Sequence, residues 1–94
     1  MPTFFAVKRF KRQYEKLTAE QKILFMQAVA LLVESIRRGR YHKSLRIKRF
    51  HGQEGVWEIT WAPNGRALFK YGKEVKPGEA HVIWLNVGTH DIFK

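Results

Sequence analysis

The chain has 94 residues and a formal net charge of +10, from 18 Lys and Arg against eight Asp and Glu. Its length is that of one domain with one hydrophobic core. It contains no cysteine, which excludes disulfide-stapled folds and thiolate sites. We expect a single domain over residues 1–94 that works in the cytoplasm.

The apolar segments are too short for export or membrane insertion. Residues 1–7 run at once into Lys8 and Arg9, which is not the pattern of a secretory signal. The longest apolar run, residues 23–33, is interrupted by Gln27, and a bilayer span needs about 20 residues. We therefore expect no membrane partner.

The positive charge is concentrated in the first half of the chain. Residues 1–50 carry thirteen Lys and Arg against three Glu, whereas residues 51–94 carry five residues of each sign. The densest stretch contains seven cations and no acid: Arg37, Arg38, Arg40, Lys43, Arg46, Lys48 and Arg49. A solvated face that maintains solubility is one interpretation. A polyanionic partner accounts better for one sign gathered in one place.

Two helices are predicted in the first half. Val7, Phe10, Tyr14 and Leu17 recur at helical spacing between basic residues, which indicates an amphipathic helix with a basic back. A second helix is expected from a capping box at residues 18–21 to about residue 38, followed by a glycine C-cap. Its apolar residues between positions 23 and 36 cover more than one face. We expect the first helix or another protein to cover the surplus.

The remaining segments read as strands, because their apolar residues alternate with period two. They span residues 4–7, 44–48, 56–61, 66–71 and 81–87, and the last is apolar on both faces, as in an interior strand. The predicted fold is α+β in the order β-α-α-β-β-β-β, with two helices packed on one face of a mostly antiparallel four- to five-stranded sheet. The other face should carry six polar side chains: Arg46, Lys48, Glu58, Thr60, Arg66 and Lys70.

The inventory of reactive residues excludes most enzyme classes. Asp91 is the single aspartate, and four scattered histidines without cysteine argue against a metal site. No glycine-rich phosphate loop or serine nucleophile motif is present. Metal-free and cofactor-free chemistry remains, in which the substrate brings its own nucleophile. RNA does so with its 2′-hydroxyl, and attack on the adjacent phosphate then needs a base, an acid and cations.

Three segments of the second half resemble the RelE/ParE toxin superfamily. They are a glycine turn with an aromatic and acidic strand (residues 52–59), a Gly65-Arg66 strand ending at Tyr71, and an apolar strand ending in Gly88-Thr89-His90. The size and the two leading helices also match. The resemblance implies the toxin of a type II toxin–antitoxin pair, with a cognate antitoxin as partner in a complex that could be a heterotetramer.

Two functional branches follow from the resemblance. RelE-like members cleave mRNA, usually on the ribosome and without metal, whereas ParE-like members inhibit DNA gyrase. His90 near the chain end favours the ribonuclease branch. A basic nucleic-acid-binding domain without activity is a third alternative.

The resemblance also implies site residues. Arg66 would contact the scissile phosphate, His90 would transfer a proton, and Glu58 would be its counterpart in place of the founding member's lysines. Arg66 could instead be a solvated hairpin residue, and Glu58 could simply pair with Lys48 or Arg66 across the sheet. The expected RNA contacts are Arg46, Lys48, Arg49, Thr60, Lys70 and Phe93, the last replacing a common family tyrosine.

Overall fold

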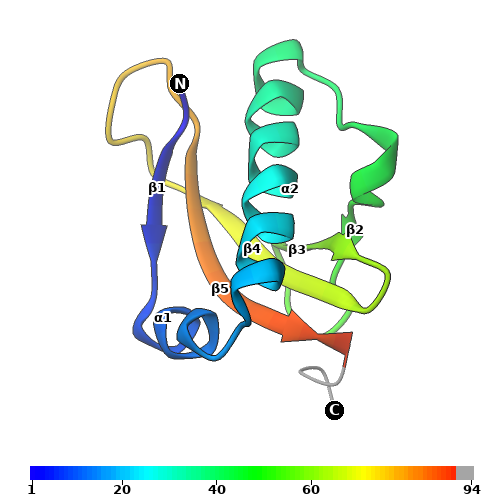
Figure 1. The fold of residues 1–94 in the computed structure, drawn as a ribbon. Coiled ribbons are helices and arrows are strands. Elements are labelled where there is room, and N and C mark those ends of the chain that lie inside the picture. The colour runs from blue at the N-terminus through cyan, green and yellow to red at the C-terminus, as the bar shows by residue number, and fades with distance from the viewer. Residues whose placement is uncertain (91–94) are drawn as a thin grey trace.

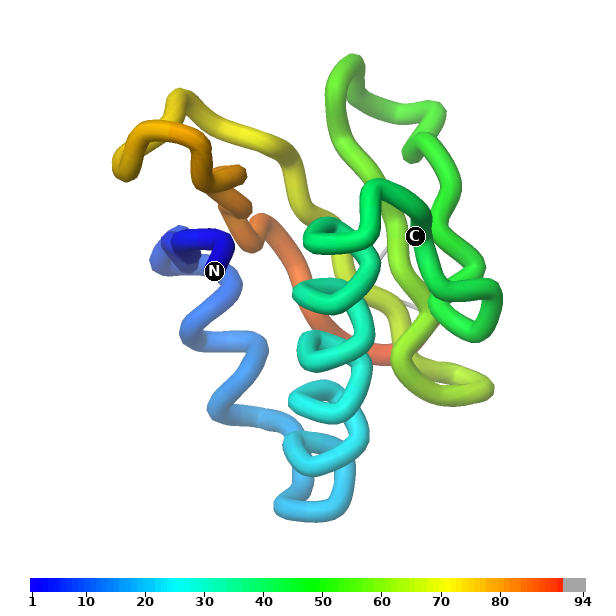
Figure 2. Tube along the Cα trace, turned by 90° about the horizontal axis from the view of Figure 1, so that it is seen from above, coloured from blue at the N-terminus to red at the C-terminus, as the bar shows by residue number. Residues whose placement is uncertain are grey.

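The structure, a computed structural model, describes residues 1–90. Two α-helices pack on one face of a five-stranded sheet, as predicted (Figures 1 and 2). The strand order is β1-β5-β4-β3-β2, and β1 is parallel to β5 while the other neighbours are antiparallel. The elements are β1 (Thr3–Ala6), α1 (Lys8–Glu15), α2 (Ala19–Arg38), the 3₁₀ helix η1 (Lys43–Leu45), β2 (Lys48–Arg49), β3 (Val56–Ala62), β4 (Gly65–Gly72) and β5 (His81–Thr89).

The bounds of α2 follow from its caps. The Thr18 hydroxyl accepts a hydrogen bond from the Gln21 backbone N–H, and the Gln21 side chain accepts one from the Thr18 N–H, so the capping box is confirmed. Gly39 ends the helix with φ of 75°, a left-handed conformation that favours glycine. In the described part of the chain no helix has the length and apolar character needed to cross a membrane.

An aromatic cluster joins both helices to the sheet. The Trp84 ring of β5 lies 5.7 Å from Phe10 of α1 and 5.2 Å from Phe25 of α2, measured between ring centroids. Phe25 also meets the edge of Trp61 on β3, at 6.2 Å. Offset and edge-on contacts of this kind add to the burial of apolar surface. The cluster holds both helices on one side and leaves the other side of the sheet without a helical cover.

The connection from α2 to β2 differs from the prediction. The strand expected over residues 44–48 was wrong: residues 43–45 form η1, and β2 has only two residues. Ser35 Oγ accepts from the His42 N–H at 2.8 Å, and His42 Nδ1 accepts from the Ser44 N–H at 3.1 Å, which coils the chain here. Leu45 then enters the core at 1 % exposure, and Arg46 adopts a left-handed φ of 47°. The alternation of apolar and polar residues carries no signal for a left-handed backbone conformation at an arginine.

Strand β5 is an interior strand, as predicted, between β1 and β4. Strand β1 pairs with it only as far as Trp84, and the β4–β5 register shifts just beyond that residue. Beyond that point α1 replaces β1 as the neighbour of β5, because the Gln13 side-chain oxygen accepts a hydrogen bond from the Val87 N–H at 2.9 Å. Gln13 was missed in the sequence, although a polar residue beside an apolar stripe is the signal for such a bond.

Close packing shapes the β3–β4 hairpin. A Cβ placed on Gly65 would lie 2.5 Å from the indole ring of Trp61, so only glycine fits without displacement of that ring. The Trp61 Nε1 donates a hydrogen bond to the Arg66 carbonyl at 2.9 Å, which fixes the ring over the hairpin. The first residues of β4, including Arg66, are therefore held by a core side chain.

Gly65→Ala should destabilise the protein by about 1–3 kcal/mol, the usual cost of overpacking. Because the clash is with the benzene part of the indole, Trp61→Phe should relieve it. We expect the double variant to be less destabilised than the sum of the two single variants, as measured by urea unfolding. Strict additivity would show that the Trp61 ring is not the obstacle.

Candidate nucleic-acid interface and active site

The face of the sheet opposite the helices, the open face, gathers most of the predicted site. Cross-strand pairs place Thr60 opposite Arg66, and Glu58 between Lys48 of β2 and Leu68 of β4. Successive side chains alternate between the faces of a strand, so these polar residues share one side. The register thus confirms the predicted grouping of Lys48, Glu58, Thr60 and Arg66.

Glu58 is a buried carboxylate between two cations. Glu58 is 7 % exposed as a whole residue. Its Oε2 lies 3.7 Å from Lys48 Nζ and 3.8 Å from Arg66 Nε. A buried charge is costly unless it is paired, so these cations stabilise the carboxylate. The cross-sheet pairing considered for Glu58 is confirmed, with both partners at once.

Arg66 is anchored to its own hairpin. Its Nη1 donates to the carbonyl oxygens of Ala62, Pro63 and Gly65 at 3.3, 3.2 and 2.9 Å. The side chain is only 17 % exposed, so it is not the solvated hairpin residue considered as an alternative. Nη1 is turned to the hairpin and Nε to Glu58, which leaves Nη2 to face a ligand.

His90 follows directly on β5 beside this arginine. Gly88 pairs with Arg66 across the sheet. Two residues later, the His90 N–H donates to the Asn64 carbonyl at 2.9 Å, which continues the pairing to the hairpin. His90 is exposed. The topology therefore brings His90 and Arg66 to the same end of the same hairpin.

Arg46 reaches the site by a different route from the one predicted. It follows η1 and helps to line a surface pocket of about 540 Å³ at the β3 edge of the sheet. Thr60 and Arg66 line the same pocket, together with α2 residues that include Leu24 and Gln27. We call this hollow the edge pocket. It connects the open face with the loop that carries Arg46.

Two predicted RNA contacts lie away from this group. Arg49 lies on the helix-side face, because it pairs with Trp57 in register and its guanidinium lies 5.5 Å from that ring, so its contact with RNA stays a prediction separate from the open face. Lys70 shares the open face but lies four residues along β4 from Arg66, about 13 Å at strand spacing. Phe93 lies outside the described residues.

Two cations of the basic stretch, at the end of α2, share one acidic partner. Arg37 and Arg38 both pair with Glu34, one turn earlier on the helix. Hydrogen bonds from these two arginines lower the pKa of Glu34 to about 2. This pairing was not predicted, although Glu34 stands three and four residues before the two arginines, the spacings at which ion pairs form on a helix.

The other histidines lie in local settings. His42 caps η1, and His81 Nδ1 lies 2.7 Å from the Thr3 hydroxyl. Within residues 1–90 there is no group of three or more His, Cys, Asp or Glu side chains that could hold a metal ion.

Arg66→Lys should destabilise the fold by about 1–2 kcal/mol, because the shorter side chain ends in a single nitrogen that cannot contact the hairpin carbonyls and Glu58 together, as Nη1 and Nε do; hydrogen bonds of charged groups typically contribute about 1.5–3 kcal/mol. Urea unfolding measures the change. Lys70→Ala, at an exposed position of the same strand, is the control and should stay within about 0.5 kcal/mol of wild type. Equal stability of Arg66→Lys and wild type would contradict the anchoring role.

The sequence matches no protein-family model, and no curated protein is significantly similar to it. Solved structures do share its fold. The YoeB/ParE toxin from Agrobacterium tumefaciens superposes with a TM-score of 0.66 at 9 % identity, over 94 % of this chain and 98 % of that chain.

Two toxins solved with their antitoxins are similarly close. The E. coli DinJ–YafQ complex matches with a TM-score of 0.65 at 10 % identity, over 98 % of this chain and 97 % of that chain. The RelB–RelE complex from Methanococcus jannaschii matches at 0.61 and 13 % identity, over 95 % and 93 %. The two helices, the sheet and their connections thus agree over nearly the whole chain. The protein has the fold of the RelE, YafQ and YoeB/ParE toxins.

Proposed function

We propose that the protein is the toxin of a bacterial type II toxin–antitoxin pair and acts as a metal-independent mRNA endonuclease in the cytoplasm. One observation carries the proposal: an anchored arginine stands beside a buried carboxylate on the open face of a RelE-like sheet, and the backbone of His90 is bonded to the hairpin that carries this arginine. Phosphoryl transfer within RNA requires a charge-stabilising cation and two proton-transfer groups. Arg66, Glu58 and His90 are those three groups.

The reaction is an in-line attack within the substrate. The 2′-oxygen of the RNA forms a bond to the adjacent phosphorus, and the bond from phosphorus to the 5′-oxygen breaks, which yields a cyclic phosphate and a 5′-hydroxyl end. Arg66 stabilises the charge that develops on the phosphoryl oxygens through Nη2, the nitrogen that faces neither the hairpin carbonyls nor Glu58. Because Nη1 is fixed by three carbonyls, the guanidinium is already oriented before substrate binds.

Two protons move in this reaction. Glu58 accepts the proton of the 2′-hydroxyl, and protonated His90 donates a proton to the departing 5′-oxygen. Histidine is suited to the second role because imidazole both gives and takes a proton near neutral pH. Glu58 also orients Arg66 through the contact of 3.8 Å between Oε2 and Nε.

The RNA backbone is held by cations around these groups. Lys48 lies beside Glu58, Arg46 and Thr60 line the edge pocket, and Lys70 extends the open face. The substrate in this proposal is mRNA, presented by the ribosome.

Arg66→Ala and His90→Gln should each abolish growth arrest and RNA cleavage. His90→Gln keeps much of the shape but transfers no proton, and general acid–base assistance is worth about 10²–10⁴ in rate. Loss of a charge-stabilising donor typically costs about 10²–10³. Cleavage is mapped by primer extension on ribosome-bound mRNA. Lys70→Ala should retain cleavage at reduced affinity, which serves as a control for loss of charge.

A gyrase inhibitor of the ParE-like kind would give the opposite results in these assays. If both variants stay toxic, and the wild-type protein cuts no RNA while it blocks supercoiling by gyrase, the ribonuclease proposal is wrong. Since Arg66 also anchors the hairpin, unfolding of each variant must be measured first. A folded Arg66→Lys protein without cleavage would support the role in charge stabilisation.

The antitoxin is proposed to bind the apolar surface beside α2. A groove of about 480 Å³ runs between β1, α1 and α2 and is lined by Phe4, Phe10, Met26 and Val29, among others. Ile23 and Met26 are 60 % and 52 % exposed. An amphipathic helix of the antitoxin would cover these side chains, in a complex that could be a heterotetramer.

Ile23→Asp combined with Met26→Asp should therefore prevent neutralisation by the antitoxin while the toxin remains folded and active. Co-purification with the antitoxin and growth on its co-expression provide the readouts. Val75→Asp, at a position 67 % exposed in the β4–β5 loop, is the matched control and should remain neutralised. Normal neutralisation of the double variant would place the antitoxin elsewhere.

A further inference from the structure

Helix α1 carries cations at positions where the helix dipole and the repulsion of like charges disfavour them. Lys8, Arg9, Lys11 and Arg12 are exposed, and no acid stands in the first turn. Cations near a helix N-terminus oppose the helix dipole, and like charges three or four residues apart repel. Among the described residues, none of these four side chains forms an ion pair that would relieve the repulsion. A helix that bears this cost is expected to have an anionic ligand.

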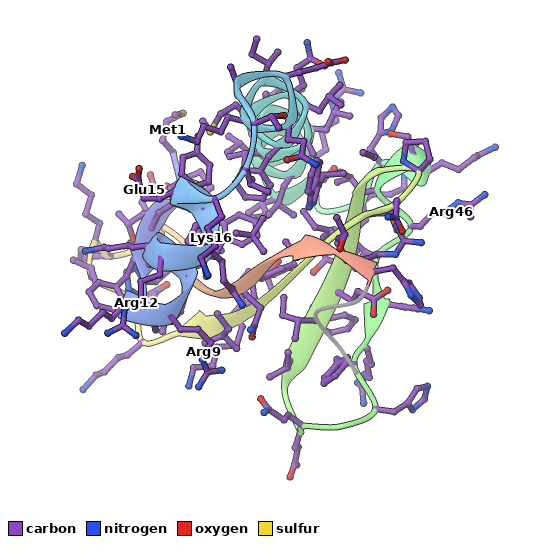
Figure 3. The ribbon with its side chains drawn as sticks, turned by 60° about the horizontal axis from the view of Figure 1, so that its bottom comes forward. Met1, Arg9, Arg12, Glu15, Lys16 and Arg46 are labelled. Atoms are coloured by element: carbon purple, nitrogen blue, oxygen red, sulfur yellow. The ribbon has the colours of Figure 1, made fainter. Side chains whose placement is uncertain are left out.

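The packing of α1 divides its cations between two flanks. Phe10 faces the core, and Gln13 faces β5 through its hydrogen bond with Val87. Lys11 and Glu15 lie on the other flank, where they line the apolar groove. At 100° per residue, three cations share the flank beside Gln13, which we call the α1 flank. Its members are Arg9, Arg12 and Lys16 (Figure 3).

The α1 flank continues the candidate active site. Gln13 binds the N–H of Val87, and the next residue, Gly88, is the one that pairs with Arg66. Beyond Trp84 the edge of β5 is no longer paired with β1, so α1 borders the open face there. Figure 3 shows the labelled cations of α1 on one side of the strands and Arg46 on the other. Arg66 is linked to both groups: it pairs with Gly88, next to the Val87 that binds Gln13 of α1, and it lines the edge pocket together with Arg46.

We propose that the α1 flank binds phosphates of the same single-stranded RNA that is cut at Arg66. This inference rests on the proposed function and extends it, because it assigns the enzyme a substrate strand longer than the scissile dinucleotide. The strand would run across the end of β5, with cations of α1 on one side and of the edge pocket on the other.

The composition of the flank favours nucleic acid over a protein partner. Protein interfaces depend on buried aromatic or aliphatic anchors, and Arg9, Arg12 and Lys16 have no exposed apolar residue between them on this flank. The groove on the opposite flank does have such anchors, including Phe4 and Met26. A row of cations without apolar neighbours fits a phosphate backbone.

Binding of RNA strands of two lengths tests this inference. The strands are 2′-O-methylated, so they lack the attacking hydroxyl, and measure about 4 and about 16 nucleotides, the range of sites on single-strand-binding domains. Wild type should bind the longer strand more tightly. Arg9→Glu with Arg12→Glu should lose most of that gain, about tenfold or more, and keep the affinity for the short strand. Its salt dependence should fall by about 1.4 in log–log slope, about 0.7 per lost contact.

Lys73→Glu with Lys76→Glu is the matched control, with the same charge change in the β4–β5 loop. If it weakens long-strand binding as much as the α1 variant does, the effect is one of net charge and the inference is overturned. The same holds if the α1 variant keeps full affinity for the long strand, or loses antitoxin binding instead. A wild-type protein that binds neither strand would overturn the proposed function as well, whereas cleavage and short-strand binding without a length effect would overturn this inference alone.

Discussion

The contact of Trp84 with Phe10 and Phe25 determines the layout of the molecule. Both helices are fastened by it to one face of the sheet, around a strand that lies between β1 and β4. The opposite face is consequently left to polar side chains. The same contact fixes the rotation of α1 about its axis, because Phe10 must point inward. The direction of the α1 cations is thus a consequence of core packing.

On the open face, the charge of one carboxylate organises its neighbours. Glu58 is nearly buried and draws Lys48 and Arg66 toward it from two different strands. Removal of the carboxylate would leave two cations without their common partner. This arrangement explains how a basic protein keeps an arginine at 17 % side-chain exposure beside other cations. The three carbonyls that accept from Nη1 complete the anchoring.

The sequence predicted features that depend on local chemistry. The caps of α2 and the turn at Asn64-Gly65 are such features, and they came out correctly because neighbouring residues determine them. What the sequence did not predict depends on distant partners. Arg49 faces the helix side because β2 is paired in one register, and a shift by one residue would reverse it. The three carbonyl bonds of Arg66 depend on how closely the hairpin closes on Trp61, which no pattern in the sequence reports.

The two flanks of α1 differ in the kind of partner that each can bind. Lys11 and Glu15 border the apolar groove, whereas Arg9, Arg12 and Lys16 lie beside β5 and the open face. Under the proposed function, an antitoxin helix confined to the groove would cover Phe4 and Met26 and leave the α1 flank and Arg66 open to RNA. The groove supplies the apolar anchors that a protein partner needs, whereas the flank supplies cations alone. One short helix would therefore serve two different partners, because core packing at Phe10 separates its apolar groove from its basic flank.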